Sequence, residues 1–556
     1  MRPTHPLTWL EAPRAGCGVE LFDATSVVHR PYPDIADLAT RISGGLIEAG
    51  IPRGAVVPLL CATGPDLISA FYGVQAAGCV VSVIAPPSAV SGDAHRDHIR
   101  AIVTVLDTDV FLVDVAHHDY LENVLAEGER RVRLLVLEQL DEATAARRAP
   151  DERALVQFTS GSSGRPRGVQ ISHAALAANA AAIRAWEQAG PDDVWCSWLP
   201  MHHDMGLIGC LVVPVSGNND LAVCTPETFI RDPRVYLRRF DAHSVPRPAT
   251  ITATPAFGLQ RIVDKIGHDD LAGTDLSRTR AVIVGAERID PVLVRRFTEL
   301  LAPHGLDPRT LTPAYGLAES TLAVTGVPIT AAPTSLRVRR ADLQIGSAVT
   351  PVGEQEQDGD VVEVISCGRA LQGLDVRVVD AEGGSVPEGH VGEIVVSGSS
   401  LADGYLAATP SAGTAFAGDT LHTRDAAFEI GGEFFVLGRS GDSVKVNARS
   451  LFAEDVELLL VRAGLHTSRV CVVLGERGSH AYAYAVLEGL DSHAAELAAG
   501  VLATACPGTR RHILQVPRGA IPRTTSGKTR RRQLWHEITQ SAPLTRPGTS
   551  TDHQPA

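Results

Sequence analysis

The chain has 556 residues, of which 44% are hydrophobic and 21% are charged, and this balance is that of an ordinary globular protein. The length exceeds what one compact core accommodates, so we expect at least two domains. Fifty Lys and Arg against 64 Asp and Glu give a formal net charge of −14, which argues against nucleic acid and anionic membranes as general partners. Any anion-binding site must therefore be local.

The cysteines and the N-terminus indicate the cellular compartment. Nine cysteines are scattered over the chain without a Cys-x-x-Cys pair, which predicts free thiols in a reducing environment. The N-terminus lacks the apolar core of a signal peptide, and no apolar run reaches membrane-spanning length. We therefore expect a cytoplasmic protein with no membrane insertion.

From residue 34 onward, helical periodicity alternates with short apolar runs. The expected helices are 34–50, 65–77 and 94–106, and the expected strands are 55–61, 80–84, 110–115 and 134–137. Strands that alternate with helices are typical of an α/β domain with mainly parallel sheets. The pattern leads through a polar linker, 141–151, to the most distinctive stretch of the chain.

A loop rich in glycine and hydroxyl side chains follows the apolar strand 154–158 and precedes an Ala-rich helix expected from His173. Glycines let successive backbone N–H groups turn toward one anion, and hydroxyl groups and an arginine add donors and charge. The candidate phosphate-binding residues are Thr159, Ser160, Gly161, Ser162, Ser163, Gly164 and Arg167. No Gly-Lys-Ser/Thr run closes the loop, which distinguishes it from a P-loop. The alternative is a flexible Gly/Ser loop.

The α/β pattern continues to about residue 326 and then changes. The expected elements are helices 174–187 and 233–242, strands 221–224, 250–254 and 281–284, an aperiodic surface excursion 328–360, and strands 375–379, 392–396 and 433–437. A polar turn from Gly438 to Asp442 marks the expected domain boundary. We expect an α/β protein with a large N-terminal domain, 1–438, that ends in a β-rich subdomain. A smaller α+β domain, 439–540, and a disordered tail, 541–556, follow.

Five further segments carry residues suited to nucleotide chemistry. They are W-L-P-M-H-H-D-M-G-L-I-G at 198–209, V-G-A-E at 284–287, Y-G-L-A-E-S-T at 315–321, L-H-T-R-D at 421–425 and P-R-T-T-S-G-K at 522–528. A tyrosine offers a flat face to a purine, and a carboxylate binds a hard cation or a ribose diol. Taken singly, each segment has a plainer explanation. His202 and His203 suit a metal site or a core histidine pair, Tyr315 suits packing, and Lys528 suits a solvated turn.

In their order and spacing, the loop and these segments resemble the adenylate-forming superfamily of acyl-CoA synthetases, peptide-synthetase adenylation domains and luciferases. The segments 198–209 and 336–343 resemble the fatty acyl-AMP ligase branch, whose members pass activated fatty acids to carrier proteins. The resemblance covers residues 34 to 536. It implies an N-terminal AMP-binding domain and a C-terminal domain that is mobile.

The resemblance also implies roles for individual residues. Besides the loop, the nucleotide-binding residues would be Gly285, Ala286, Glu287, Tyr315, Gly316, Asp425 and Arg439, the last two at the ribose. Glu319 would act in catalysis by holding a Mg²⁺ ion that bridges phosphate oxygens. His203 would border the acyl pocket. Lys528 would neutralise charge while the acid oxygen attacks the α-phosphate.

Several positions depart from the family pattern. Arg167 stands where lysine is usual, Arg424 replaces a glycine and could crowd the ribose, and Gly441 stands at the hinge where Asp or Lys is usual. Thr252 and Thr254 place polar groups near the expected pocket. These threonines indicate an acid that is short, aromatic or functionalised.

The resemblance implies ATP-dependent adenylation of a fatty or other small carboxylic acid, with release of pyrophosphate. The activated acyl group would then pass to the phosphopantetheine thiol of a carrier protein. Within the same chemistry, the acid could be an aryl acid or an inorganic oxyacid such as nitrite, and the acceptor coenzyme A or an amine. A third interpretation is a nucleotide-binding protein that has lost catalysis, because of Arg167, Arg424 and Gly441.

Overall fold

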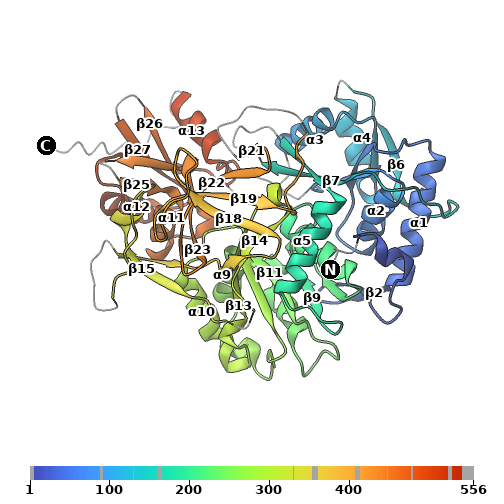
Figure 1. The fold of residues 1–556 in the computed structure, drawn as a ribbon, viewed down its shortest axis with the longest axis horizontal. Coiled ribbons are helices and arrows are strands. Elements are labelled where there is room, and N and C mark those ends of the chain that lie inside the picture. Colours follow the sequence, from blue (N-terminus) through green and yellow to red (C-terminus); the bar gives the residue numbers. More distant parts are fainter. Residues whose placement is uncertain are drawn as a thin grey trace. The chain divides into compact units, whose positions relative to one another are not determined.

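The computed structural model describes residues 5–87, 92–128, 130–160, 166–329, 331–353, 361–406, 414–446, 449–477, 480–523 and 529–540. Contacts divide the chain into a larger unit that runs to Leu437 and a smaller unit that begins at Gly438. Figure 1 shows both units.

The first large sheet of the larger unit is mixed, with a parallel centre. Its strands, in spatial order, are β17 (Arg369–Ala370), β14 (Ala323–Gly326), β13 (Leu311–Gly316), β12 (Ala281–Gly285), β11 (Ile251–Pro255), β9 (Val194–Ser197), β10 (Asp220–Val223), β1 (Gly18–Phe22) and β2 (Val27–Pro31). β11, β12 and β13 are parallel neighbours. Their carboxyl ends therefore lie along one edge of the sheet, where ligands bind in open α/β sheets.

A second sheet has a parallel core and an antiparallel edge. Its strands, in spatial order, are β20 (Gly404–Tyr405), β8 (Pro166–Ser172), β7 (Arg153–Ser160), β4 (Val80–Val83), β3 (Val56–Leu60), β5 (Val110–Val113) and β6 (Arg133–Val136). β3, β4 and β5 are buried at every residue. Continuous apolar strands of this kind are typical of a parallel sheet covered on both faces.

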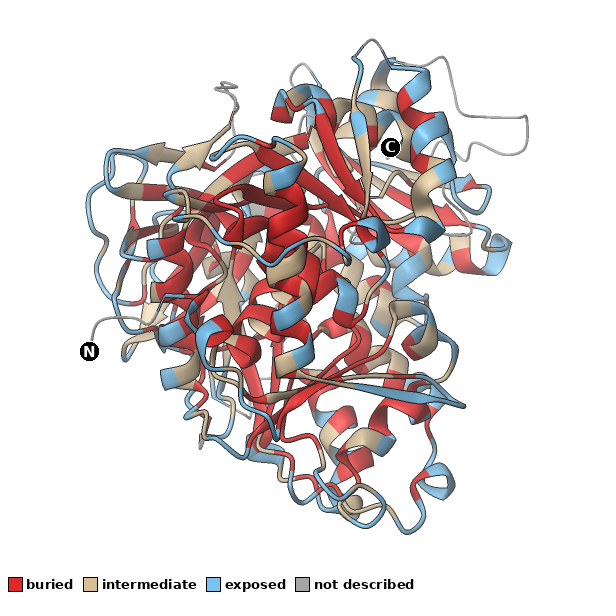
Figure 2. Cartoon of the chain, turned by 90° about the vertical axis from the view of Figure 1, so that its right-hand side faces the viewer, coloured by how far each residue is buried: buried red, intermediate tan, exposed pale blue. Residues whose placement is uncertain are grey.

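Helices of the larger unit cover and separate the two sheets. They are α1 (Tyr32–Glu48), α2 (Pro65–Ala76), α3 (Asp93–Leu106), α4 (His118–Ala126), α5 (His173–Trp186), α6 (Val213–Ser216), α7 (Pro226–Arg231), α8 (Pro233–Leu237), α9 (Ala256–Lys265) and α10 (Pro291–Leu301). α2 contacts β1 of the first sheet and β3 and β4 of the second. Nearly all its residues are buried, because it packs between the two sheets. Figure 2 shows many helices and strands of the interior in red, the colour of buried residues.

The β-rich end of the larger unit contains more strands than the sequence predicts. The strands are β15 (Ser335–Arg339), β16 (Val361–Ile365), β18 (Leu374–Val379), β19 (Gly392–Gly398), β21 (Ala415–Ala417), β22 (Thr420–Ile430) and β23 (Glu433–Arg439). β15 pairs with β16, so the excursion expected over 328–360 contains ordered structure at its start. β22 is the longest of these strands and carries the segment 421–425.

The smaller unit is an α+β fold. Its elements are β24 (Ser443–Val446), β25 (Arg449–Phe452), α11 (Ala453–Arg462), β26 (Val470–Arg477), β27 (His480–Glu488), α12 (Ser492–Ala505), β28 (Arg510–Val516) and α13 (Arg531–Gln540). β26 pairs antiparallel with β27, and β27 pairs parallel with β28. The predicted fold class, a large α/β domain with a smaller α+β domain, is confirmed. The tail from residue 541 lies outside the described residues.

Two expectations about local structure are wrong. The Gly/Ser loop does not lie between a strand and a helix, because Pro166–Ser172 forms β8, which pairs antiparallel with β7. α5 begins only after β8, where the Ser172 hydroxyl accepts the Ala175 N–H and caps the helix. The helix expected over 233–242 is shorter, because α8 ends at Leu237 and a 3-10 turn, Arg238–Phe240, leads to Asp241, which accepts the N–H groups of His243 and Asp275.

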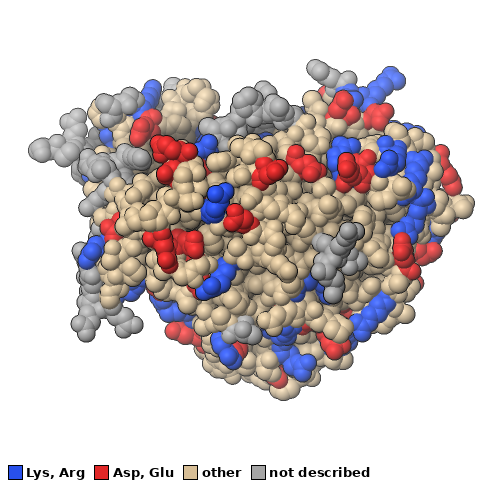
Figure 3. Space-filling model, viewed as in Figure 1, with Lys and Arg blue, Asp and Glu red and all other residues tan. Residues whose placement is uncertain are grey.

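The cysteine side chains are buried, and the surface carries charges of both signs (Figure 3). All nine cysteines are free and buried, and burial raises the pKa of the Cys367 thiol to about 12. Acidic and basic side chains are interspersed on the face drawn in Figure 3. Of the helices that the structure describes, none combines the length and apolarity needed to cross a membrane.

Candidate active site

The candidate phosphate loop is the turn of the β7–β8 hairpin. Thr159 pairs with Arg167, and Ser160, the last residue of β7, pairs with Pro166. Gly161, Ser162, Ser163 and Gly164 lie outside the described residues. The two strands thus bring the two ends of the loop together.

Arg167 is held by aromatic and backbone contacts. Its guanidinium carbon lies 3.6 Å from the centre of the Tyr405 ring, and its Nη2 donates to the Thr414 carbonyl oxygen over 3.2 Å. A planar guanidinium makes both contacts at once, which an ammonium group does less well. Arg167, which departs from the family pattern, is therefore held in place by Tyr405 and Thr414.

Glu319 lies in a short 3-10 turn, Ala318–Ser320, directly after β13. Only 5% of the residue is exposed, and its carboxylate Oε1 accepts the Tyr405 hydroxyl over 2.6 Å. The Glu319 carbonyl oxygen accepts the Ala402 N–H over 3.0 Å. A buried carboxylate with a fixed orientation fits a Mg²⁺ ion, because Mg²⁺ prefers oxygen ligands in near-ideal geometry.

Tyr315 and Asp425 are in direct contact. The Tyr315 hydroxyl on β13 donates to Asp425 Oδ2 on β22 over 2.6 Å. Asp425 is 6% exposed, and its N–H donates to the Thr423 hydroxyl over 3.1 Å. The expected adenine platform and the expected ribose acceptor thus lie side by side.

The side-chain contacts of Arg424 are made with Glu393 and do not crowd Tyr315 and Asp425. Its N–H donates to Glu393 Oε1 over 3.2 Å, and its Nη1 lies 3.3 Å from Glu393 Oε2. The backbone at Arg424 has a φ of +64°, the region that favours glycine. The substitution for glycine is therefore accommodated by Glu393, with the backbone strain retained.

The turns after β12 and β13 meet at one sheet edge. Gly285 ends β12, and a Cβ added there would lie 3.1 Å from the Ala314 carbonyl oxygen. Gly316 ends β13, and its added Cβ would lie 2.0 Å from the Leu322 carbonyl oxygen, so only glycine fits. Ala286 has a φ of +67°. Glu287 accepts the Phe257 N–H over 3.3 Å, which ties the turn to the start of α9.

The segment that contains His202 and His203 lies against the β7–β8 hairpin. It also lies against the sheet edge where the turns after β12 and β13 meet. Gln157 of β7 donates to the His202 carbonyl oxygen over 2.9 Å. His203 Nδ1 lies 2.6 Å from Asp204 Oδ1. The Met205 methyl group lies 3.7 Å from the Cβ position at Gly285, and a π-helical turn, Met205–Val212, follows. The segment is thus placed beside the turn expected to contact adenine.

The metal-site alternative for the histidine segment finds no support in the part of the chain that the structure describes. The side chains close enough there to share one ion are those of His118, Asp119 and Glu122 on α4, which are partly or fully exposed. None of them belongs to the motifs. Exposed acidic groups of this kind are common without a metal.

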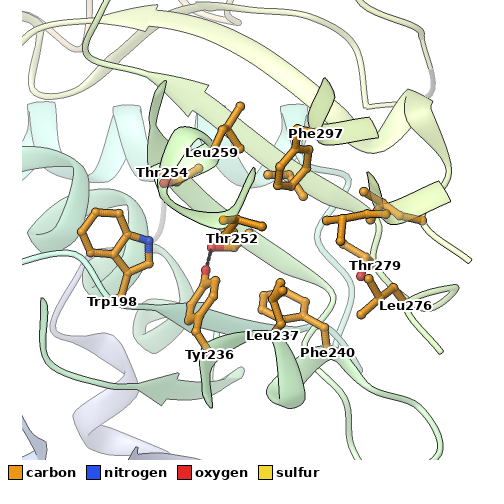
Figure 4. A pocket seen from close by; sticks show the side chains of 14 residues that line it. Trp198, Tyr236, Leu237, Phe240, Thr252, Thr254, Leu259, Leu276, Thr279 and Phe297 are labelled. Atoms are coloured by element: carbon orange, nitrogen blue, oxygen red, sulfur yellow. Dashed lines mark hydrogen bonds between the residues drawn. The ribbon is translucent and has the colours of Figure 1, made fainter. Parts of the chain in front are cut away.

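A cavity of about 30 Å³ is lined mainly by residues of β11, β12, α8, α9 and α10 (Figure 4). Most of its lining is apolar, but the Tyr236 hydroxyl is hydrogen-bonded to the Thr252 hydroxyl, and Thr254 also lines it. The Trp198 indole N–H and the Thr279 hydroxyl, both buried, have no hydrogen-bond partner among the described residues. The cavity therefore combines an apolar wall with polar groups at several points.

The smaller unit carries the remaining candidates. Arg439 is the last residue of β23, which crosses from the larger unit into the smaller one after Leu437, and it is exposed. Lys528 lies outside the described residues. Arg531, at the start of α13, donates to Asp442 (3.3 Å), Glu454 (2.8 Å) and Glu457 (2.6 Å). Burial raises the pKa of Glu454, and Arg531 opposes the shift. This cluster ties the helix after the Lys528 segment to the polar turn at 440–442.

Tyr405, Thr414 and Glu393 are residues around the site that the sequence does not single out. Tyr405 appears in it only as part of a Gly-Tyr-Leu segment, without a sign that it would meet Glu319. An aromatic residue in a short strand is usually a packing residue. The position of Tyr405 beside Glu319 depends on the fold.

Comparisons with known proteins give consistent matches. The model of the family described as AMP-binding enzyme matches residues 22–406. A long-chain-fatty-acid–AMP ligase, FadD26, of Mycobacterium marinum is 30% identical over 537 residues, covering 89% of this chain and 88% of the relative. A 4-hydroxyphenylalkanoate adenylyltransferase of Mycobacterium tuberculosis is 28% identical over 531 residues, covering 88% and 83%. A solved structure from a study of fatty acyl-adenylate ligases of E. coli and L. pneumophila superposes with a TM-score of 0.85 at 25% identity, covering 96% of each chain.

Proposed function

The chain belongs to the family of AMP-binding enzymes, and we propose that it adenylates a carboxylic acid with ATP. A carboxylate oxygen attacks the α-phosphorus, the bond to the β-phosphate oxygen breaks, and acyl-AMP and pyrophosphate form. The observation that carries this proposal is the grouping of Tyr315, Asp425 and Glu319 at one sheet edge. An aromatic face, a buried acceptor for a ribose diol and a buried carboxylate are what a magnesium nucleotide requires.

The larger unit supplies most of the nucleotide site in this proposal. The β7–β8 hairpin binds the phosphates, Asp425 and Arg439 bind the ribose, and Glu319 holds Mg²⁺. When bound, Mg²⁺ offsets the negative charge of the phosphate oxygens. Gly285 and Gly316 let the backbone approach the base, because a side chain at Gly316 would collide with Leu322.

Lys528 is the proposed catalytic cation. Its ammonium group neutralises charge that develops between the attacking carboxylate and the α-phosphate, which is the main need when both reactants are anionic. The Arg531 cluster supports this role, because it anchors the start of α13 three residues further along the chain. No covalent intermediate on the enzyme is required.

The acid is proposed to be a fatty or other small carboxylic acid. The relatives are named for long-chain fatty acids and for hydroxyphenylalkanoates. The cavity at Trp198 and Thr279 supports a tail that is short or that ends in a polar group, because 30 Å³ holds roughly one or two water-sized groups. The acceptor is proposed to be the phosphopantetheine thiol of a carrier protein.

Acid-dependent release of pyrophosphate tests the proposal. The panel contains straight-chain acids of increasing length, ω-hydroxy acids and hydroxyphenylalkanoic acids, each with Mg²⁺ and ATP. Transfer is then followed with a phosphopantetheinylated carrier protein and, separately, with coenzyme A. Normal ATP binding without acid-dependent pyrophosphate release would reject adenylation and favour a nucleotide-binding protein that has lost catalysis.

A further inference from the structure

We propose that Tyr405 is a positioning residue that orients Glu319 for Mg²⁺, and that Arg167 acts through Tyr405 by fixing its ring. The inference rests on the proposed function, because it assigns Glu319 to the metal. It differs from the family expectation for Arg167, which is a direct contact of the side chain with phosphate. In this proposal, Arg167 helps to hold the Glu319 carboxylate in position through Tyr405.

The contact between Tyr405 and Glu319 limits the rotation of the carboxylate. The hydroxyl lies 2.6 Å from Oε1, and Glu319 is almost fully buried, so little water competes for this oxygen. The backbone of the same segment holds the turn as well, since Ala402 donates to the Glu319 carbonyl oxygen. Hydrogen bonds to the ligands of a metal orient those ligands and typically change metal affinity by about 10- to 100-fold.

The fold ties Tyr405 to the hairpin that carries the phosphate loop. Tyr405 pairs with Val169 of β8, and its neighbour Leu406 donates to the Gly168 carbonyl oxygen over 2.8 Å. The Asp403 backbone N–H donates to the Gln170 carbonyl oxygen, also over 2.8 Å. Tyr405, which is proposed to orient Glu319, is therefore paired with β8, the strand that follows the candidate phosphate loop. This pairing connects the proposed phosphate-binding loop with the proposed metal ligand.

Arg167 and Phe416 hold the Tyr405 ring. The Arg167 guanidinium carbon lies 3.6 Å from the ring centre, and the Phe416 ring meets the tyrosine edge-on at 5.6 Å between centroids. The bond from Arg167 to the Thr414 carbonyl oxygen keeps the guanidinium in this place. Lysine keeps the charge but loses the flat stacking surface, so an arginine at this position has a geometric reason.

Three variants of the full chain test the proposal: Tyr405→Phe, Arg167→Lys and the double variant. Tyr405→Phe keeps the ring and removes only the hydroxyl. We expect it to raise the Mg²⁺ concentration that half-saturates ATP binding by about 10-fold, with the KM for the acid unchanged. Arg167→Lys should act in the same direction but less strongly. It should add little in the Tyr405→Phe background, because both changes act through one contact.

The primary measurement is calorimetric binding of ATP at a series of Mg²⁺ concentrations, with kcat and KM for pyrophosphate release measured in parallel. Tyr482→Phe, which removes a hydroxyl that accepts from Arg510 in the smaller unit, is the matched control. A wild-type Mg²⁺ dependence in Tyr405→Phe would overturn the role of Tyr405. An equal loss from Arg167→Lys in both backgrounds would assign Arg167 to phosphate instead. Because binding needs no turnover, a wild-type enzyme inactive on every acid would refute the proposed function while this test still gives a result.

Discussion

Arg424 shows how a single residue can depart from a family pattern while the site around it is kept. Its φ of +64° places it in the left-handed region, where a side chain costs about 1–2 kcal/mol relative to glycine. The ion pair with Glu393 is half exposed on the arginine side and contributes about 0–1 kcal/mol. We therefore expect Arg424→Gly to raise the free energy of unfolding by up to about 1 kcal/mol, and to retain adenylation.

Arg424→Ala is the matched control for this prediction. It loses the same ion pair but keeps a Cβ in the strained conformation, so we expect it to be less stable than the glycine variant. Urea unfolding of the full chain measures both free energies. A glycine variant that is less stable than the alanine variant would show that backbone strain does not control stability at this position.

At the scale of residues, the sequence predicts the candidates but not their partners. Glu319, Tyr315 and Asp425 follow from motif spacing, because their residue types match the chemistry of a nucleotide. Tyr405 lies 86 residues from Glu319, and Tyr315 lies 110 residues from Asp425. Which side chains meet over such separations depends on strand register and on the turn after β13. The same holds for Glu393, which accommodates Arg424 from the neighbouring strand.

At the scale of elements, the start of α5 contains a titratable group in an apolar position. The ring of His173 stacks on that of His5 at 4.5 Å between centroids, and both its nitrogens are buried without a hydrogen-bond partner among the described residues. Burial, followed by the proximity of His5, lowers the pKa of His173 from 6.5 to about 4. The folded state therefore favours the neutral ring. Its contribution to stability is fully present above pH 6.5 and is lost as the pH falls toward 4.

His173→Phe tests this contribution. The shift corresponds to about 3 kcal/mol of stability between the two pH limits, and a phenyl ring removes the titration. We expect the free energy of unfolding of the variant to fall less between pH 7 and about 4.5 than that of the wild type. His493→Gln, at an exposed position of α12, serves as the control for the loss of a histidine elsewhere. Equal slopes for wild type and His173→Phe would reject the assignment.

The cavity between the first sheet and its covering helices makes a second prediction at this scale. The Thr279 hydroxyl has no hydrogen-bond partner in the described part of the chain, whereas the Thr252 hydroxyl is bonded to Tyr236. We expect Thr279→Val to leave the free energy of unfolding unchanged or to raise it by up to about 1 kcal/mol. Thr252→Val should lower it by about 1–3 kcal/mol, because it weakens the bonding of a buried phenol. Urea unfolding compares the two variants, and a larger loss for Thr279→Val would contradict the prediction.

Elements with strong local signals were predictable from the sequence. α2 and α3 begin and end within one residue of the expected limits. A proline starts α2 and an acidic residue starts α3, and their apolar residues are nearly continuous in α2 and recur at helical spacing in α3. β1, β2 and β8 are not predicted by the sequence analysis, and the reasons for β2 and β8 differ. β2 is exposed or half-buried throughout, and β8 lies within a stretch whose glycines and hydroxyls indicate a loop. Pairing with β7 across the loop decides the conformation there, and pairing is not visible in local composition.

At the scale of the whole molecule, the residues proposed for the reaction are divided between the two compact units. Tyr315, Glu319, Asp425 and the β7–β8 hairpin belong to the larger unit, whereas Arg439 and Lys528 belong to the smaller one. This division allows ATP to be held by one unit while the other supplies the catalytic cation. The two half-reactions should therefore respond differently to a change in the smaller unit.

Lys528→Ala separates the two half-reactions. The larger unit keeps the proposed contacts to adenine, ribose and Mg²⁺, so we expect ATP binding to persist. The rate of acid-dependent pyrophosphate release should fall by about 100-fold or more, since the variant loses the ammonium group proposed to lie between two anionic reactants. Transfer from acyl-AMP supplied from outside to a carrier-protein thiol should continue, because that step does not bring a carboxylate against a phosphate. Lys265→Ala, at an exposed lysine at the end of α9, is the control for loss of a positive charge elsewhere. Near-normal pyrophosphate release by Lys528→Ala, or loss of ATP binding and transfer together with adenylation, would show that Lys528 is not the cation of the first step.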